Sequence, residues 1–142
     1  MTALEDAWQA ALASEQQAAF GYALLGPQLS GTPRHLAWHA GGAHQRSVDD
    51  TSAAMAAAGL TPTPPPADYP QLYPVSGPHA ARALAARLED ECAAAWRYLY
   101  AVAASTSDPA ATARRAEAQG ALIASAVRAT RWHGSSVPFP GI

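Results

Sequence analysis

Residues 60–75 read LTPTPPPADYPQLYPV, and this proline-rich stretch decides which helical fold the chain can adopt. Proline lacks the backbone N–H that a helix interior needs, so the stretch is predicted to be an extended linker. Such a linker reaches roughly 50 Å, whereas a helix of about 26 residues is roughly 39 Å long. The linker is therefore long enough to cross a helical domain from end to end.

Two helical segments are predicted on each side of this linker. Helices begin at Ser, Thr or Asp caps, often with proline in the first turn, and end at glycine or proline. Thr32-Pro33 and Asp108-Pro109 have the pattern of a helix start, and Gly26-Pro27 that of a helix end. The predicted helices span residues 2–26, 32–58, 76–104 and 108–132.

The lengths of the connections predict the topology. About five residues join the first two helices and about four join the last two, and such short connections make neighbouring helices antiparallel. Two helical hairpins joined by one long crossover is the connectivity of ferritin-like folds. We therefore predict one all-α domain over residues 1–142, an antiparallel four-helix bundle of the ferritin-like class with a long crossover between its second and third helices.

Composition narrows the class of partner. The net charge is −2, and the nine basic residues are all arginine and are scattered along the chain, which argues against nucleic-acid binding. No apolar run approaches the roughly 20 residues of a membrane span, so we expect no membrane insertion and a cytoplasmic location. The single cysteine, Cys92, lies among apolar residues and is expected to serve packing.

Polar residues interrupt the inward-facing stripes of the predicted helices. The predicted stripes are Leu4, Trp8, Ala11, Glu15, Ala18, Tyr22 and Leu25 on the first helix; Leu36, Ala40, His44, Val48, Thr51 and Met55 on the second; Ala85, Leu88, Cys92, Trp96 and Leu99 on the third; and Thr112, Ala116, Ile123, Val127 and Thr130 on the fourth. At about 100° per residue, Glu15 falls in the middle of the first stripe, His44 near the middle of the second and Glu89 about 60° from the centre of the third. On the fourth helix Gln119 is predicted inside the stripe, and Glu117 at its edge. A buried carboxylate is costly unless it is paired, protonated or bound to a metal, so these positions predict a buried polar cluster.

Several blocks of the sequence resemble a known family. They are Glu15-Gln-Gln-Ala-Ala-Phe-Gly-Tyr22, Ala43-His44-Gln-Arg, Leu88-Glu89-Asp90, Ala94-Ala95-Trp96-Arg97, Arg131-Trp132 and Phe139-Pro140-Gly141. Their order and spacing resemble an uncharacterised ferritin-like family of actinobacteria over nearly the whole chain. The resemblance implies a ferritin-like bundle and leaves the activity open.

A di-iron centre of the ferritin-like kind takes one Glu from each of two helices and a Glu-x-x-His pair from each of the other two. Glu15 and Glu89 match the single carboxylates, and His44 matches one histidine. Gly41 stands where the glutamate before His44 is expected, and Gly120 stands where the histidine after Glu117 is expected. The departures argue against a complete di-iron oxidase or storage site.

Three functions remain open, and the sequence does not decide whether the protein is an enzyme. We favour a binding or scaffold module without metal, in which the buried cluster sets the helix register. The alternative is one Fe, Mn or Zn ion held by Glu15, His44 and Glu89, with Gln119 or Glu117 as further candidate ligands. A third is a small ligand held between Trp8, Tyr22, Trp38 and Trp96.

Two further expectations concern contacts with other parts of the protein or other molecules. The tail carries Val137-Pro138-Phe139-Pro140-Gly141, and we expect its apolar residues to pack on a helix or on another subunit. Helical bundles commonly pair, so a homodimer is a candidate state, but no stripe on the sequence identifies its interface.

Overall fold

A computed structural model describes residues 1–134 of the chain, and all regular structure in that range is helical. Its four long helices are α1 (Ala3–Leu25), α2 (Gly31–Ala57), α3 (Gly77–Ala104) and α4 (Ala111–His133). Two single 3-10 turns, η1 (Gly26–Gln28) and η2 (Pro70–Leu72), complete the regular elements. The predicted number and order of helices are confirmed, and the predicted tail contacts lie outside the described residues.

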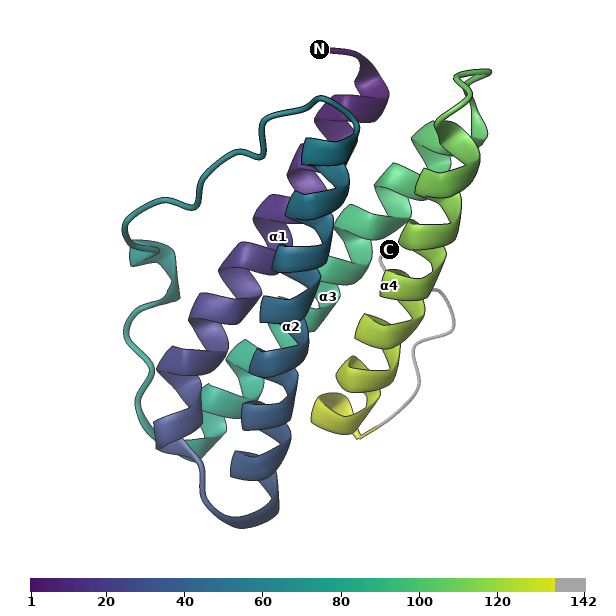
Figure 1. Cartoon of the computed structure of the whole chain (residues 1–142). Helices are drawn as coiled ribbons and strands as arrows, with labels where there is room; N and C mark the ends of the chain where they lie inside the picture. Colours follow the sequence, from purple (N-terminus) through teal and green to yellow (C-terminus); the bar gives the residue numbers. More distant parts are fainter. Residues whose placement is uncertain (135–142) are drawn as a thin grey trace.

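The four helices lie side by side as two pairs. Figure 1 shows α1 and α2 joined by a short turn at the lower end, and α3 and α4 joined at the upper end. The main helix contacts join α1 to α2, α1 to α3 and α3 to α4, so α2 and α4 form the most loosely packed side. None of the helices in residues 1–134 has the combination of length and apolarity needed to cross a membrane.

The ends of the helices follow local chemistry. Thr2 caps α1 by accepting from the backbone N–H of Glu5, whose carboxylate accepts in return from the N–H of Thr2, a complete capping box. Gly134 follows α4 with φ of +75°, a left-handed conformation that favours glycine and commonly ends helices.

The proline-rich linker forms a strap along α1. It runs from the upper end of α2 to the lower end of α3 (Figure 1), as its length predicts. Gln9 exchanges hydrogen bonds with Thr61 and Thr63, at 2.9 and 3.0 Å, and Gln16 donates to the carbonyl oxygen of Thr63 at 2.9 Å. Tyr69 packs on Phe20 at a ring distance of 5.0 Å. Glutamine side chains on α1 thus satisfy backbone groups of a strap that cannot form its own ladder.

The core is built by the stripes predicted for the first three helices. All seven residues predicted on the α1 stripe are buried, and so are the five on the α3 stripe. On α2, Ala40, His44, Thr51 and Met55 are buried, whereas Leu36 and Val48 are only partly covered. The predicted positions of the polar residues on these three helices are therefore correct to within a turn.

The predicted inward face of α4 is wrong. Ile123 and Val127, placed inward by the pattern, are 55% and 52% exposed, and Gln119 is exposed as well. The buried residues are instead small or carry a polar head, and they are Ala111, Arg114, Ala118, Ser125 and Ala129. Alanine occurs on several faces of α4, so hydrophobicity alone does not identify the face that packs on α3.

Candidate functional site

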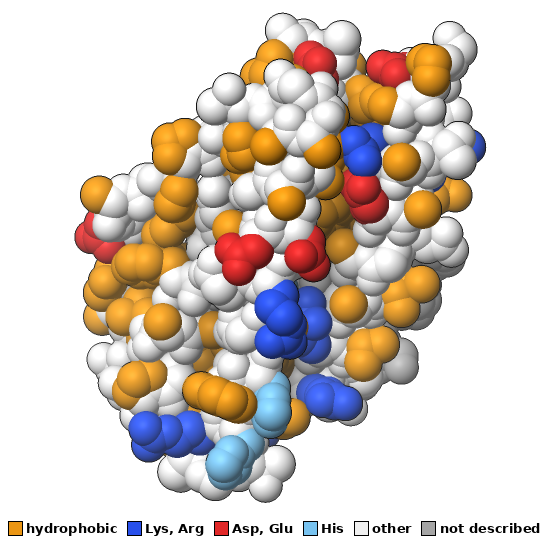
Figure 2. Space-filling model, viewed as in Figure 1, with side chains coloured by type: hydrophobic (Ala, Val, Ile, Leu, Met, Phe, Trp, Pro, Cys, Tyr) orange, Lys and Arg blue, Asp and Glu red, His pale blue; other side chains and the backbone are white. Residues whose placement is uncertain are grey.

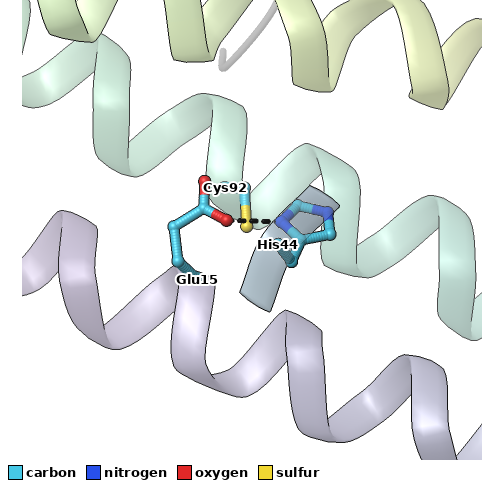
Figure 3. Close-up of side chains that lie close together, drawn as sticks. All are labelled: Glu15, His44 and Cys92. Carbon is cyan, nitrogen blue, oxygen red and sulfur yellow. Dashed lines mark hydrogen bonds and ion pairs between the residues drawn. The ribbon is translucent and has the colours of Figure 1, made fainter. Parts of the chain in front are cut away.

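The candidate site lies in the middle of the bundle, where α1, α2 and α3 meet. Glu15, His44 and Glu89 each come from the middle of a different helix, and their exposed fractions are 1%, 0% and 0%. The structure therefore brings together the three residues that the sequence predicted as the core of a polar cluster. Figure 3 shows Glu15 and His44 pointing toward each other, with Cys92 of α3 beside them.

Both nitrogens of the His44 ring face carboxylates. Nδ1 forms a hydrogen bond with Oε2 of Glu15, and Nε2 lies 3.1 and 2.9 Å from Oε1 and Oε2 of Glu89. Gly41, one turn before His44, lets α2 approach α1, because a Cβ there would lie 3.1 Å from Cβ of Tyr22. The imidazole is thereby held as a bridge between α1 and α3.

Further side chains donate hydrogen bonds to the two carboxylates. The indole N–H of Trp96 donates to Oε1 of Glu15 at 2.7 Å, and the hydroxyl of Tyr22 donates to Oε2 of Glu89 at 2.5 Å. Trp132 in turn donates to the Tyr22 hydroxyl at 2.8 Å, and the Tyr22 ring stacks on His44 at a centroid distance of 5.5 Å. Each carboxylate therefore accepts from at least two side chains.

Arg128 of α4 is the member of the site that sequence reasoning missed. Its Nε donates to both oxygens of Glu89, at 3.1 Å each, and its side chain is 21% exposed. A buried carboxylate generally needs a cationic partner, and this was the one signal in the sequence that pointed to an arginine. That requirement does not select one of the nine arginines. The error in the face of α4 had placed Arg128 away from the core.

The charges within the network balance when His44 is protonated. Burial by itself would lower the pKa of the imidazole, but the contacts with Cys92, Glu15 and Glu89 outweigh burial and raise that pKa to about 12. Burial would raise the pKa of Glu89, but hydrogen bonding and the charge of His44, together with Arg128, hold it below its usual range. Two carboxylates thus face two cations in a largely dry interior.

Two further groups of the site are held neutral. Burial, reinforced by the charge of Glu89, raises the pKa of the Tyr22 hydroxyl well above its ordinary value. Burial raises the pKa of the Cys92 thiol to about 11, and its sulfur donates to the carbonyl oxygen of Ser14 at 3.4 Å. Cys92 is therefore buried, as expected, but it lies beside Glu15 and His44 and not among apolar residues alone.

The other residues predicted as metal ligands lie elsewhere. Glu117 accepts from Nη2 of Arg114 at 2.6 Å on the partly exposed side of α4. Gln119 is exposed, so its predicted inward position is wrong, and nothing about its placement supports a ligand role. The position of these two side chains leaves Glu15, His44 and Glu89 as the candidate set.

The donor atoms of the site fit a metal ion only in part. Glu15, His44 and Cys92 each place one ligand atom within 4.8 Å of the others, and a carboxylate, an imidazole and a thiolate are ligands of zinc and iron. A dinuclear centre does not fit, because Gly41 and Gly120 supply no ligand at two of its six positions. One ion would fit only if His44 gave up one of its two carboxylate contacts.

The four aromatic residues predicted to line a ligand cavity are not gathered around one, although Tyr22 and Trp38 both line a hollow of ≈ 410 Å³ between α1 and α2. Trp8 and Trp96 are buried, with Trp8 under the guanidinium of Arg114 at 3.7 Å, whereas Trp38 is 75% exposed. Trp96 contacts Glu15, and Tyr22 contacts Glu89. Trp8, Tyr22 and Trp96 therefore belong to the core and the network, whereas Trp38 lies on the surface.

An open groove lies on the loosely packed side, between α2 and α4. It consists of two adjoining hollows of ≈ 450 and ≈ 470 Å³ that share Ala43, Arg46, Ala124 and Arg128. Sequence reasoning did not find it, because it depends on the true face of α4. Glu15 and Trp96 line its upper half, so the groove reaches the edge of the buried network.

Comparisons with known proteins agree with this architecture. The model of a family described as a domain of unknown function, DUF4439, matches residues 7–142. The chain is similar to the crystal structure of a conserved hypothetical protein from Mycobacterium tuberculosis, with 32% sequence identity and a TM-score of 0.81. That similarity covers 92% of this chain and 95% of the other. No match is found among curated proteins.

Proposed function

We propose that this chain, which belongs to the DUF4439 family, is an antiparallel ferritin-like bundle that works without a metal as a binding module. The ferritin-like assignment is supported by the two helical hairpins and the long strap between α2 and α3. The binding role is supported by the groove between α2 and α4, which is the one loosely packed side of the four long helices described.

The observation that carries the metal-free assignment is the occupation of both His44 nitrogens. A histidine that binds a metal offers one nitrogen to the ion and orients the ring through the other. In this site a carboxylate oxygen lies within hydrogen-bond distance of each nitrogen, and a second donor satisfies each carboxylate. This pattern is that of a closed ionic network, in which no nitrogen is directed at a vacant position.

The network has a structural role under this proposal. It connects α1, α2, α3 and α4 through side chains in the interior, and shifting any one helix by a turn would leave a buried charge without its partner. A fully paired polar network in a core favours one register over the alternatives. The rigid frame would then present the groove in a fixed shape.

One observation favours a second candidate function, a mononuclear metal protein. The sulfur of Cys92 stands beside Glu15 and His44, so three different ligand types converge on one point. Such a set, with Glu89 as a fourth ligand, would suit Fe, Mn or Zn. It would require the carboxylate contacts of His44 to rearrange when the ion enters.

Elemental analysis by plasma mass spectrometry separates these two functions. The untagged protein is purified without chelator, incubated with Fe²⁺, Mn²⁺ or Zn²⁺, desalted, and compared with Glu15→Gln and Cys92→Ser. We expect substoichiometric metal that is the same in all three proteins. Metal near one equivalent that falls in both variants would overturn the metal-free proposal and support the mononuclear site.

A triple variant tests the structural role of the network. His44→Leu combined with Glu15→Gln and Glu89→Gln removes the three fully buried charges, while the glutamine oxygens still accept from Trp96 and Tyr22. Arg128 remains, but its side chain is 21% exposed, so water can solvate its charge. Replacing a whole buried ionic cluster is commonly neutral or stabilising, so we expect a folded protein whose unfolding free energy is close to that of the parent. A large loss of unfolding free energy in this variant would contradict this expectation.

A further inference from the structure

The groove between α2 and α4 is open because small residues face each other across it. Ala40 and Ala43 of α2 stand opposite Ala121 and Ala124 of α4 around the two hollows. Figure 2 shows this face, where arginine side chains gather in the middle, below a group of acidic side chains and above the histidines. The groove therefore has an acidic end and a basic end.

The basic end gathers three arginines and one histidine. Arg46 and His39 reach it from α2, and Arg128 and Arg131 reach it from α4. Apolar side chains line the same hollow, and they are Leu36, Val127 and Trp132. Positive charge and apolar surface thus occur together in a space of ≈ 470 Å³.

Two of these arginines have no ion-pair partner among residues 1–134. Arg46 and Arg131 form no ion pair with any residue of the described range, whereas Nε of Arg128 is engaged by Glu89. At the opposite end of the groove Glu117 is engaged by Arg114, which leaves Asp50 as the acidic group without an ion pair there, again among residues 1–134. An anion entering the groove is therefore directed to its lower, basic end.

We propose that this basic end binds the phosphate group of a soluble phosphate monoester that carries an apolar chain or ring. The inference rests on the proposed function and gives its binding module a ligand class. A phosphate monoester carries about two negative charges at neutral pH, matching the two unbalanced guanidinium groups. Arginine forks suit phosphate oxygens in geometry, and the apolar part would lie against Leu36, Val127 and Trp132.

Arg128 links this groove to the interior. Its Nε contacts Glu89 in the network, and the same side chain lines both hollows. Trp132 also lines the groove and donates to the Tyr22 hydroxyl, which contacts Glu89. A bound phosphate ester would therefore change the surroundings of the Trp132 indole, which makes tryptophan fluorescence a direct readout.

Octyl phosphate is the test ligand, titrated into the full chain with calorimetry and tryptophan fluorescence in parallel. Arg46→Gln and Arg131→Gln remove the unbalanced charges from the groove, and Arg82→Gln, an exposed arginine of α3, is the matched control. We expect saturable binding by the parent and by Arg82→Gln, and about tenfold or greater weakening in each groove variant, since each loses a charge-assisted hydrogen bond.

Three comparison ligands separate the parts of the proposal. Inorganic phosphate and octanol should each bind far more weakly than octyl phosphate, because each lacks half of the ligand. If octanol bound as tightly as octyl phosphate, the groove would not recognise the phosphate group. If inorganic phosphate bound as tightly, the groove would not recognise the apolar part of the ligand. Binding to phosphatidic-acid vesicles without binding of octyl phosphate would mean that the groove recognises a membrane surface and not a soluble ligand. That result would overturn the proposal.

The same samples keep this inference apart from the proposed function. Metal content is measured before each titration. Absence of saturable octyl phosphate binding up to millimolar concentration in metal-free protein would overturn the ligand class and leave the metal-free bundle standing. Stoichiometric metal lost in Glu15→Gln would overturn the metal-free bundle whatever the titration gives.

Discussion

On one side of α2, His44 is fully buried between two carboxylates, whereas two residues further along the helix Arg46 is exposed and lines the groove that faces α4. Two residues on a helix are about 200° apart, so the same helix presents opposite sides to the interior and to the groove. The buried side pairs every charge within the protein. The exposed side leaves a charge that solvent or a ligand can satisfy.

The difference follows from the cost of taking a charge out of water. A buried ion must find its partners inside the protein, so His44 is tied to Glu15 and Glu89 and its neighbours complete the bonding. An exposed guanidinium carries no such requirement, because water solvates it. Stability and binding are thereby assigned to different sides of one helix.

The largest effect is expected from the paired deletions His44→Ala and Arg46→Ala. Removing His44 leaves two carboxylates buried with only one cation, and breaking a buried ionic pair in this way costs about 3–5 kcal/mol. Removing the exposed Arg46 should change the unfolding free energy by less than about 0.5 kcal/mol. Urea unfolding followed by circular dichroism measures both.

His35→Ala controls for the loss of a histidine, because His35 is exposed near the start of α2. It should behave like Arg46→Ala. If His44→Ala were no more destabilising than these two variants, the network would contribute nothing to stability and the contrast between the two sides of α2 would fail.

A pH series gives the next largest effect. The folded protein raises the pKa of His44 to about 12 from an ordinary value near 6.5, so it holds a proton that the unfolded chain releases. The stabilisation is complete below the unfolded pKa and is lost as pH rises toward the folded pKa. Between pH 7 and 8.5 the unfolding free energy should therefore fall, at most by about 1.4 kcal/mol per pH unit.

Two other kinds of group are kept out of this measurement. The range from pH 7 to 8.5 lies below the ordinary pKa of tyrosine. The variant Cys92→Ser removes the buried thiol, whose pKa is also raised. His44→Gln should show a flatter profile over the same range. A parent protein whose stability does not change from pH 7 to 8.5 would mean that His44 is neutral when folded and that the network lacks the second cation.

Tyr22→Phe tests whether the two sides of α2 communicate. The hydroxyl donates to Glu89 and accepts from Trp132, so its removal takes one donor from a buried carboxylate and leaves the Trp132 indole N–H without its acceptor. We expect a loss of about 1–3 kcal/mol and a shift in tryptophan emission. Trp132→Phe is the matched background, in which Tyr22→Phe should no longer produce that shift.

Sequence reasoning succeeded where apolar and polar residues alternate clearly. On α1, aromatic and aliphatic residues such as Trp8, Tyr22 and Leu25 define one stripe, so Glu15 stands out inside it, and the same holds for His44 on α2 and Glu89 on α3. Proline or glycine lies at one or both ends of each of the four helices, which is why the helix boundaries were predicted within about three residues.

It failed on α4, and everything that depends on α4 was missed with it. The large apolar residues Ile123 and Val127 are exposed there, while Arg114 and Ser125 are buried, because the contacts of Arg114 with Trp8 and of Arg128 with Glu89 orient the helix. Those contacts join residues far apart in the chain and have no periodicity of their own. Arg128 and the groove could therefore not be inferred from the pattern.

Two glycine variants are expected to change stability the least. They compare a tightly packed position with an exposed one. At Gly21 of α1 an added Cβ would lie 2.5 Å from Cδ1 of the buried Leu88 on α3, so Gly21→Ala forces Leu88 to move. At Gly120 of α4 nothing lies within 4 Å of an added Cβ. Alanine should therefore cost about 1–2 kcal/mol at Gly21, whereas helix propensity should make Gly120→Ala stabilising by roughly 0.5–1 kcal/mol.

Thermal unfolding of the two variants beside the parent measures these opposite signs. Stabilisation by both would mean that α1 and α3 are less tightly packed than the contact of Gly21 with Leu88 implies. Destabilisation by both would mean that the exposed face of α4 around Gly120 is covered by another surface, since a methyl group added there in water meets no obstacle. The two variants should change stability in opposite directions only if α1 and α3 are tightly packed at Gly21 and this face of α4 is free. Access of a ligand to the groove depends on that free face.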